Sequence, residues 1–279
     1  MSNQVSPLRY PGGKAKLYRY VSELINDTFE KPPVYCEPFS GGFGLGIALL
    51  MKDNISEAII NDFDFCVYAF WKCITDDTYF GKFIELVDAV EVSINEWRHQ
   101  KEIFKGYERH SILEVGFATF FLNRCNRSGI LDANPIGGIE QTGKYKMDCR
   151  FNKDNLKKTL FKIFEKRQQI RVFNEDAKLF LPKIDQYNNV LFNIDPPYFS
   201  AGPLLYKNNF KEKDHRELYQ AVKELKNRWI MTYDNEDVIR DIYKDYLVRE
   251  YSLRYHLSQK REATELIIYD KWFVDPLAV

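Results

Sequence analysis

The amino-acid sequence predicts an α/β protein in which a doubly wound sheet is interrupted by a mainly helical insertion. Short apolar runs predict strands, and runs with helical spacing of apolar residues alternate with them, for example at 14–30 and 44–51. The predicted strands are 33–36, 58–60, 170–174, 189–194, 228–232 and 265–269, the last two as antiparallel partners.

The character of the chain changes between the second and third predicted strands. Helical stretches follow one another there, at 66–74, 79–92 and 113–123, and turn formers then dominate residues 129–150. Such a long segment of turns is usually functional or flexible. We therefore predict an α/β domain built from residues 1–63 and 169–279, with residues 64–168 as an inserted domain.

Bulk composition is that of a soluble globular protein and disfavours several other classes. Hydrophobic residues make up 45% and charged residues 29% of the 279 residues, which argues against disorder. The formal net charge is zero, so any nucleic-acid surface has to concentrate its basic residues on one face. Five cysteines without a C-x-x-C pair indicate reduced thiols in the cytoplasm, and four scattered histidines give no support to a zinc site. No apolar run is long enough for a membrane span, and the first residues lack an apolar signal stretch.

A glycine-rich turn, Glu37–Gly44, follows the first predicted strand and opens a helix. Glycines let a ligand approach the backbone, and a helix N-terminus favours negative charge. Asp62 ends the next strand, where doubly wound folds place an acid for ribose hydroxyls. A tight turn without a ligand has the same pattern. The spacing does not fit G-x-G-x-x-G, and Gly12–Ala15 departs from a Walker A loop, so a nicotinamide oxidoreductase and an ATPase are disfavoured.

A second motif, Asn193–Tyr198, closes a strongly apolar strand. Two consecutive prolines fix φ and remove two N–H donors, so the chain leaves the sheet in a rigid turn. Ligands of such sheets bind at the carboxyl ends of strands. The turn is therefore suited to present the Asp195 carboxylate, a bare carbonyl and the Tyr198 ring to one planar group, although an ordinary strand-ending turn is the alternative.

These motifs resemble those of a known family. Asp195–Tyr198 resembles the D-P-P-Y catalytic motif of amino-methyltransferases, and Phe39–Phe43 resembles their F-x-G-x-G cofactor loop, with Phe43 in place of the last glycine. Pro7–Lys14 resembles the N-terminal segment of the Dam-type (D12 class) DNA adenine methyltransferases. Phe121–Arg124 and the stretch up to Asn152 resemble their target-recognition insertion, and the order of the motifs is that of the α group.

The resemblance implies both a fold and an activity. The fold is a Rossmann-like S-adenosylmethionine-dependent methyltransferase sheet with a mainly helical inserted target-recognition domain. The activity is site-specific transfer of a methyl group from S-adenosyl-L-methionine to N6 of adenine in double-stranded DNA, without a metal. The resemblance leaves open the recognition sequence and a cognate restriction endonuclease as partner. A monomer or weak dimer is adequate for this chemistry.

The resemblance also implies a set of cofactor-binding residues. Lys14 is suited to hold the cofactor carboxylate, with Tyr10 packing nearby. Asp62 would bind the ribose and Phe63 would cover the adenine ring, whereas Asp176 is expected either to accept from the adenine amino group or to cap a helix. The full predicted set is Tyr10, Lys14, Phe39, Ser40, Gly41, Gly42, Phe43, Asp62, Phe63, Asp176, Ala177 and Asp195.

The predicted catalytic residues are Asp195, Pro196, Pro197 and Tyr198. Adenine N6 is paired and stacked in a duplex, so the target base has to be flipped out. The hypothesis is that Tyr198 stacks on the flipped base. The Asp195 carboxylate and the Pro196 carbonyl would accept the two N6 hydrogens, which localises the nitrogen lone pair for attack on the methyl group.

Basic residues gather in one stretch of this neutral chain. Residues 140–171 hold ten basic and four acidic side chains, which suits contact with DNA phosphates or, equally, a solvated helix face. The side chains predicted to contact DNA are Arg124, Asn126, Arg127, Arg150 and Asn152. Residues 200–209, after the catalytic turn, are either a lid or a plain loop.

Other activities compete with this interpretation. RNA adenine or cytosine N4 are alternative targets of methyl transfer, and a catalytically silent module that binds DNA or S-adenosylmethionine is an alternative from another class. The order of the motifs over the whole chain and the N-terminal segment favour DNA adenine. An intact Asp195–Tyr198 turn and Lys14 argue against a silent module.

Overall fold

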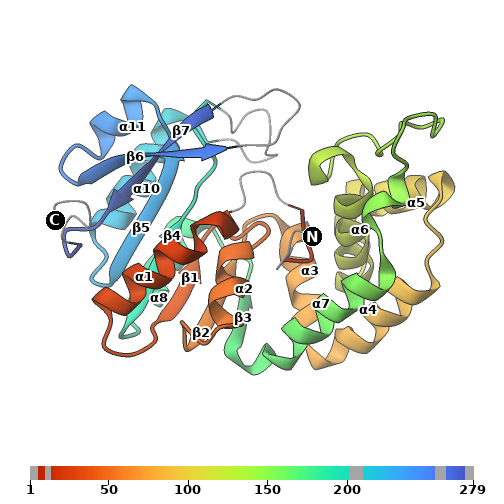
Figure 1. Ribbon diagram of the computed structural model, residues 1–279, viewed down its shortest axis with the longest axis horizontal. Helices are drawn as coiled ribbons and strands as arrows, with labels where there is room; N and C mark the ends of the chain where they lie inside the picture. Colours follow the sequence, from red (N-terminus) through yellow and green to blue (C-terminus); the bar gives the residue numbers. More distant parts are fainter. Residues whose placement is uncertain (1–5, 10–13, 201–209, 255–261, 274–279) are drawn as a thin grey trace.

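A computed structural model describes residues 6–9, 14–200, 210–254 and 262–273. Their centre is a seven-stranded sheet of order β3-β2-β1-β4-β5-β7-β6 (Figure 1). β1 to β5 pair in parallel, whereas β7 is antiparallel to both β5 and β6. The predicted doubly wound sheet and its antiparallel pair are thus confirmed. The strands are Val34–Glu37 (β1), Glu57–Asn61 (β2), Ile170–Phe173 (β3), Val190–Ile194 (β4), Arg228–Asp234 (β5), Leu247–Arg254 (β6) and Glu262–Tyr269 (β7).

The strand order reverses direction between the neighbours β1 and β4. Chain connections leave these two strands toward opposite sides, so their carboxyl ends border the crevice in which doubly wound sheets bind ligands. Both sequence motifs lie there, because the glycine-rich turn follows β1 and the Asp195–Tyr198 turn follows β4. The topology therefore brings two segments far apart in sequence to one place.

Helices cover both faces of the sheet. One apolar cluster joins one face to α1 (Tyr18–Thr28, after the 3-10 turn Lys14–Leu17), α2 (Gly44–Leu50) and α3 (Phe65–Thr75). A second cluster joins the other face to α8 (Ala177–Ile184), α10 (Glu212–Lys223) and α11 (Asp237–Ile242). Successive strand residues alternate between them: Tyr35 and Ile60 lie in the first cluster, Cys36 and Ile59 in the second. This double burial explains why the strands are continuous apolar runs.

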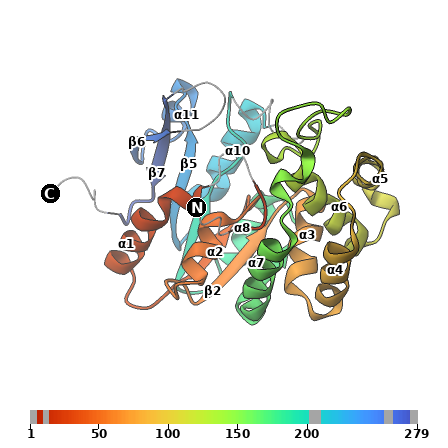
Figure 2. The same ribbon diagram turned by 45° about the vertical axis from the view of Figure 1, so that its right-hand side comes forward.

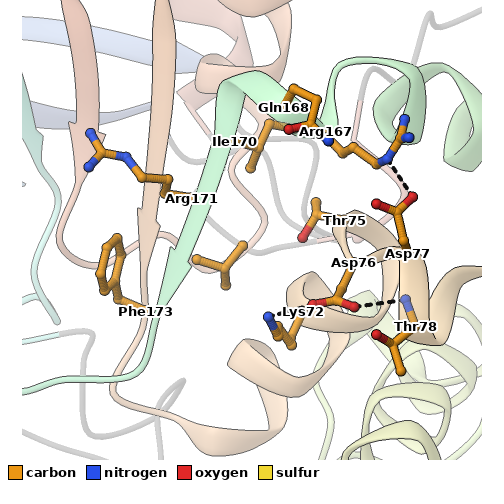
Figure 3. Close-up of a pocket in the computed structure, with 11 residues that line it drawn as sticks. Lys72, Thr75, Asp76, Asp77, Thr78, Arg167, Gln168, Ile170, Arg171 and Phe173 are labelled. Carbon is orange, nitrogen blue, oxygen red and sulfur yellow. Dashed lines mark hydrogen bonds and ion pairs between the residues drawn. The ribbon is translucent and has the colours of Figure 1, made fainter.

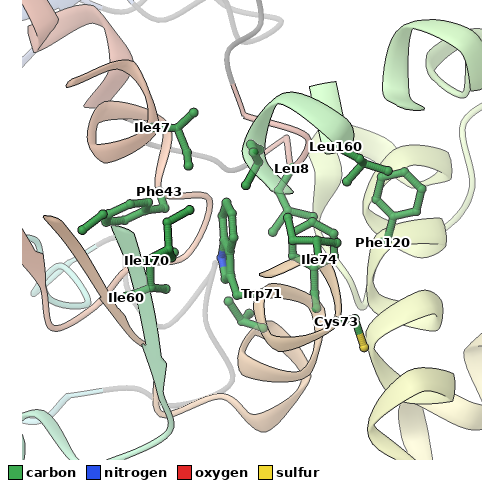
Figure 4. Packing of buried hydrophobic residues seen from close by; sticks show 14 of the residues in the cluster. Leu8, Phe43, Ile47, Ile60, Trp71, Cys73, Ile74, Phe120, Leu160 and Ile170 are labelled. Atoms are coloured by element: carbon green, nitrogen blue, oxygen red, sulfur yellow. The ribbon is translucent and has the colours of Figure 1, made fainter. Parts of the chain in front are cut away.

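The segment between β2 and β3 is helical and lies beside the sheet (Figures 1 and 2). After α3 it contains α4 (Asp77–Ala89), α5 (Ile94–Lys105), α6 (Ile112–Cys125) and α7 (Lys153–Glu165). Figure 4 shows Trp71 of α3 with Phe43 and Ile60 on the sheet side and Phe120 on the helical side. One apolar core therefore runs through both parts, and the partition into two domains stays a prediction.

Several elements were not predicted from the sequence, among them α5 and β6. α5 buries polar Gln100 and Lys101 beside Trp97 and Phe104, so its buried side is not an apolar stripe. β6 contains Arg249 and Glu250, and its strand conformation comes from its pairing with β7. Tertiary packing determines both elements more than local pattern does. No helix in the part of the chain that the structure describes is long and apolar enough to cross a bilayer.

The residue that departs from the family's glycine pattern, Phe43, has a left-handed backbone with φ of 44°. Only glycine adopts this conformation without strain, so the backbone keeps the shape that the glycine would give. The Phe43 ring is buried and lies edge-on to Trp71 at a centroid distance of 5.9 Å. A Cβ on Gly46 would lie 2.1 Å from this ring, so Gly46 makes the space that Phe43 fills.

We expect Gly46→Ala to destabilise the protein by about 1–3 kcal/mol, the usual cost of overpacking. In a Phe43→Ala background the same change should be neutral or stabilising, because the ring is gone and alanine is the better helix former by about 1 kcal/mol. Chemical denaturation of the four proteins of this cycle measures the coupling. Equal effects of Gly46→Ala in both backgrounds would show that Phe43 and Gly46 are not complementary.

Candidate active site

The carboxylate of Asp195, directly after β4, is held by two side chains. Its Oδ2 accepts a hydrogen bond from Lys14 Nζ at 2.9 Å, and its Oδ1 accepts one from Thr232 Oγ1 of β5 at 2.6 Å. Burial raises the pKa of Asp195, and the Lys14 ammonium and the Thr232 hydroxyl oppose this rise. The carboxylate is therefore fixed in direction, and the Lys14 ammonium favours its ionised form.

The hydroxyl of Tyr198 lies on the other side of Lys14. It accepts a hydrogen bond from Lys14 Nζ at 2.8 Å and donates one to Glu265 Oε2 of β7, also at 2.8 Å. Glu265 is buried and its Oε2 lies 3.7 Å from Lys14 Nζ. Lys14 is 5% exposed, and its ammonium group lies between two carboxylates and 5.0 Å from the centroid of the Tyr198 ring.

The N-terminal segment that leads to Lys14 is anchored by the end of α6. Asn123 Oδ1 accepts from the Arg9 amide at 2.7 Å, and Asn123 Nδ2 donates to the Arg9 carbonyl at 2.9 Å. Arg124 Nη1 donates to the Pro7 carbonyl at 3.3 Å. Gly129, with φ of 78°, allows the N-terminal segment to lie close to it, since a Cβ at residue 129 would lie 2.0 Å from the Arg9 carbonyl oxygen. The helical segment therefore helps to place Lys14.

The glycine-rich turn is joined to the end of β2. Ser40 Oγ accepts from the Asn61 amide at 3.0 Å and donates toward the Asn61 and Glu37 carbonyls, so Ser40 holds the turn closed. Asp62 accepts from the Gly41 amide at 2.8 Å through Oδ2 and from the Asp64 amide at 2.9 Å through Oδ1. Burial, followed by the neighbouring Asp64, raises the pKa of Asp62 to about 7. This carboxyl group is preoriented at the carboxyl end of β2.

The other predicted cofactor residues lie in different surroundings. Phe63 is 57% exposed, and its carbonyl accepts from Asn174 Nδ2 at 3.1 Å. Asp176 caps α8 by accepting from the Lys178 amide at 2.8 Å, so the helix-cap alternative holds for one of its oxygens, and Ala177 after it is buried. The Phe39 ring packs edge-on against the Phe210 ring, and the Phe43 ring lies in the core. The Gly42 carbonyl accepts a hydrogen bond from the Ser6 hydroxyl. Tyr10 lies outside the described residues.

Two polar residues beside Asp195 were missed by sequence reasoning. Glu37, the last residue of β1, is buried and accepts from Tyr35 OH at 2.7 Å and from Asn193 Nδ2 at 3.4 Å. Burial raises the pKa of Glu37 to about 8. Asn193 Oδ1 is buried without a hydrogen-bond partner among the described residues. An acid and an amide at the ends of adjacent parallel strands are a signal that could have identified them.

Arg124 and Asn126, two of the predicted DNA-contacting residues, are buried with internal partners. Arg124 also donates to the Arg150 carbonyl, and burial with the nearby guanidinium groups lowers its pKa to about 10. Asn126 accepts from Trp97 Nε1 at 2.7 Å and donates to two carbonyls. Both side chains therefore shape the helical segment, while Arg127, Arg150 and Asn152 are exposed, the last as the N-cap of α7.

We expect Arg124→Met to lower the free energy of unfolding by about 2–4 kcal/mol, because it leaves buried carbonyl groups without donors. Arg150→Ala should leave this free energy nearly unchanged, since its guanidinium lies exposed beside other positive charges, yet it should weaken DNA binding and its salt dependence. Chemical denaturation and a salt titration of DNA affinity measure the two effects. Unchanged affinity and salt dependence in Arg150→Ala would remove that residue from the interface.

Four of the ten basic residues in the stretch 140–171 form ion pairs within the molecule. Lys157 pairs with Asp88, Lys166 with Asp53, Arg167 with Asp77 and Arg171 with Glu57. A polar pocket borders this stretch at the edge of β3 (Figure 3). Its wall includes the pairs Lys72–Asp76 and Arg167–Asp77, so these charges are already neutralised. Only Lys157 of the four paired residues lies in α7, so contact with DNA phosphates and a solvated helix face both stay open for this helix.

Comparison with known proteins identifies the family of this chain. The family model of the D12 class N6 adenine-specific DNA methyltransferases matches residues 10–261. The chain belongs to the D12 class N6 adenine-specific DNA methyltransferase family. It is 22% identical to the type II methyltransferase M.CviBI of Paramecium bursaria Chlorella virus NC1A, over 90% of this chain and 91% of that protein. It is also 22% identical to the type II methyltransferase M.MjaIII of Methanocaldococcus jannaschii, over 96% of this chain and 98% of that protein.

Likeness to solved structures is weaker. The S-adenosylmethionine-dependent methyltransferase of Agrobacterium tumefaciens aligns with a TM-score of 0.39 at 10% identity, covering 90% of this chain and 59% of that one. Membership of the D12 class makes the protein an adenine-specific DNA methyltransferase, as its motifs predicted, and gives it S-adenosylmethionine as methyl donor. Among the described residues, no three histidine, cysteine, aspartate or glutamate side chains gather to hold a metal.

Proposed function

We propose that Asp195–Tyr198 is the catalytic turn with which this D12 class enzyme methylates adenine N6 in double-stranded DNA. The observation that carries the proposal is the convergence of Asp195, Tyr198 and Lys14 at the switch point between β1 and β4. A planar amine next to this turn would meet a fixed carboxylate, a carbonyl without a competing N–H and an aromatic ring.

The donors and acceptors around the switch point fit S-adenosylmethionine, which supplies the electrophilic methyl group when bound. Asp62 is preoriented to accept ribose hydroxyls, and exposed Phe63 offers a face to an adenine ring. The unpartnered Asn193 Oδ1 and the Glu37 carboxyl are acceptors suited to an ammonium group. Lys14 stays a proposed partner of the cofactor carboxylate, in addition to its contacts with Asp195 and Tyr198.

The chain's own residues would act on the base as follows. The Tyr198 ring stacks on the flipped adenine, which contributes about 1–3 kcal/mol. The Asp195 carboxylate and the Pro196 carbonyl accept the N6 hydrogens and draw the nitrogen toward a tetrahedral shape, so its lone pair points at the methyl group. Because Thr232 fixes Asp195 Oδ1, this polarisation needs little reorganisation during the reaction.

The helical segment is proposed to face DNA through its exposed basic residues. Arg127, Arg150 and Asn152 remain candidates for contacts with bases or phosphates, whereas buried Arg124 and Asn126 support them from within. Lys144 and Lys146 flank exposed Tyr145 in the turn-rich part of the same segment. Residues 201–209, most of the proposed lid, lie outside the described residues.

The family and the composition support a proposal for the cellular setting. A cognate restriction endonuclease as partner fits the type II methyltransferases among the relatives. Cys36, Cys66, Cys73, Cys125 and Cys149 are free thiols, which fits a reducing cytoplasm. We propose that the enzyme acts as a monomer or weak dimer, since one chain holds every group used above.

Methylation of plasmid DNA with labelled S-adenosylmethionine, followed by sequencing that detects modified bases, tests the proposal. N6-methyladenine at one short motif is expected, and it would also supply the recognition sequence. Label in RNA, or at cytosine N4, would assign another amino group as the target. Cofactor binding without label in any nucleic acid would indicate a silent binding module.

A further inference from the structure

Two acids stand opposite each other in the antiparallel pair β5–β7. Asp234, the last residue of β5, pairs directly with Glu265 of β7, and Figure 1 shows the two strands side by side. Directly paired residues of an antiparallel ladder project to the same side, and like charges there are destabilising. Each carboxylate therefore needs donors of its own, and both find them in the segment that follows Asp195.

Asp234 binds the backbone just beyond the catalytic turn. Its Oδ1 accepts from the Phe199 amide at 3.0 Å and its Oδ2 accepts from the Ser200 amide at 2.7 Å. Pro196 and Pro197 have no N–H, so the turn offers few amides by which it can be held. The two amides that Asp234 takes are consecutive, which fixes both the position and the direction of the chain at this point.

Glu265 binds the side chain at the end of the same turn. Its Oε2 accepts from Tyr198 OH at 2.8 Å and also from Tyr251 OH of β6, whose residue pairs directly with Glu265 in the sheet. Glu265 is 3% exposed, so its carboxylate cannot leave these donors for water. Tyr251 thus orients Glu265, and Glu265 orients Tyr198.

The start of the turn, at Asp195, is held by β4 and β5. β4 carries it into place, and Thr232 of β5 fixes the Asp195 carboxylate at 2.6 Å. Thr232 and Asp234 are two positions apart on one strand, so the same side of β5 holds both ends of the turn. The other contacts of the downstream end are the hydrogen bond from Lys14 Nζ to Tyr198 OH at 2.8 Å, the one from Ser200 Oγ to Glu236 at 2.6 Å, and ring packing of Phe199 against His215.

We propose that Asp234 and Glu265 are positioning residues that hold the Pro196 carbonyl and the Tyr198 ring in the orientation needed for the target base. This inference rests on the proposed catalytic role of Asp195–Tyr198. Neither acid is expected to touch adenine or cofactor. Both act through the turn, and displacement of a reacting group by about 1 Å can cost on the order of 100-fold in rate.

The first test compares Asp234→Ala and Asp234→Asn with the unchanged protein. We expect Asp234→Ala to lower the single-turnover rate of methyl transfer by about 100-fold at saturating DNA and cofactor, with little change in the dissociation constant of S-adenosylmethionine. Asp234→Asn keeps one acceptor oxygen, so it should recover about tenfold of this loss. Asp241→Ala removes an exposed carboxylate with one lysine partner and is the matched control, with an unchanged rate expected.

The second test asks whether Glu265 acts through the tyrosine hydroxyl. Glu265→Gln keeps an acceptor for Tyr198 and should lose less rate than Glu265→Ala. Tyr198→Phe removes the donor, and the double variant Glu265→Ala/Tyr198→Phe should be no slower than the slower single variant. If the rate loss of the double variant equals the product of the two single losses, Glu265 does not act through Tyr198, and this result would overturn its assigned role.

The outcomes separate this inference from the proposed function. If Asp195→Ala is inactive while Asp234→Ala has a normal single-turnover rate, the positioning role is wrong and the catalytic turn stands. If Asp195→Ala stays active, the proposed turn itself is wrong. A purely structural Asp234 would lower the melting temperature and leave the rate per folded molecule unchanged, and that result would also overturn the inference.

Discussion

Asp195→Ala is expected to lower methyl transfer by at least about 1000-fold, the largest loss expected at any position of the site. The variant loses the fixed acceptor that polarises adenine N6. The two acids nearby are engaged elsewhere, because Glu265 accepts from two tyrosine hydroxyls and Glu37 accepts from Tyr35 and Asn193. S-adenosylmethionine should still bind within about tenfold of its normal affinity, since Asp62 and Phe63 are unchanged. Single-turnover assays and equilibrium dialysis of the cofactor measure the two quantities.

Asp195→Asn is the matched variant for this prediction. It keeps the size and one acceptor oxygen, but it loses the charge and puts an amide N–H₂ where an acceptor stood. We expect it to stay at least about 100-fold slower than the unchanged enzyme, because the amide has to choose among Thr232, Lys14 and the base. Methyl transfer by Asp195→Ala at a rate near normal would exclude the proposed chemistry.

The parts of the fold that the sequence predicts are those with strong local signals. β4 and β5 are apolar because both their faces are buried, and the Asp195–Tyr198 motif is recognisable because prolines end a strand so rarely in this way. The resemblance then supplied the family, which the comparison confirms. The residue pattern alone did not decide the role of Asp176, which could cap a helix or bind the cofactor. In the structure one of its oxygens caps α8.

The partners of the motif residues could not be predicted, because they depend on register and topology. Thr232 and Glu265 lie 37 and 67 positions from the residues they hold, on strands whose pairing is fixed by the whole sheet. The sequence also did not predict that the side chains of Arg124 and Asn126 are buried. A residue type that suits DNA also suits an internal partner. Arg124 binds the Pro7 carbonyl of the N-terminal segment, whereas Asn126 binds Trp97 and the Leu131 carbonyl within the helical segment.

Lys14→Met is expected to lower the rate of methyl transfer by about 100-fold at neutral pH, a loss of the same order as that of Asp234→Ala, and the loss should be partly recovered as the pH rises. Asp195 has to be ionised to accept from the base, and its pKa is already raised by burial and lowered again by the Lys14 ammonium. Removal of the ammonium leaves Asp195 near Glu265 without a cation between them, so the pKa of Asp195 rises further. Activity falls as the pH drops through this pKa, so the acid limb of the pH–rate profile moves to higher pH.

Lys14→Arg separates charge from geometry. It keeps a positive charge beside Asp195, so its acid limb should stay near that of the unchanged enzyme, although the larger guanidinium lowers the rate. Single-turnover rates from about pH 5 to pH 10 at saturating cofactor give the limb of each variant, and cofactor titrations show separately whether Lys14 binds the carboxylate of S-adenosylmethionine. If the limb of Lys14→Met coincides with that of the unchanged enzyme, Lys14 does not control the ionisation of Asp195. Its contact at 2.9 Å would then serve to place the carboxylate rather than to keep it charged.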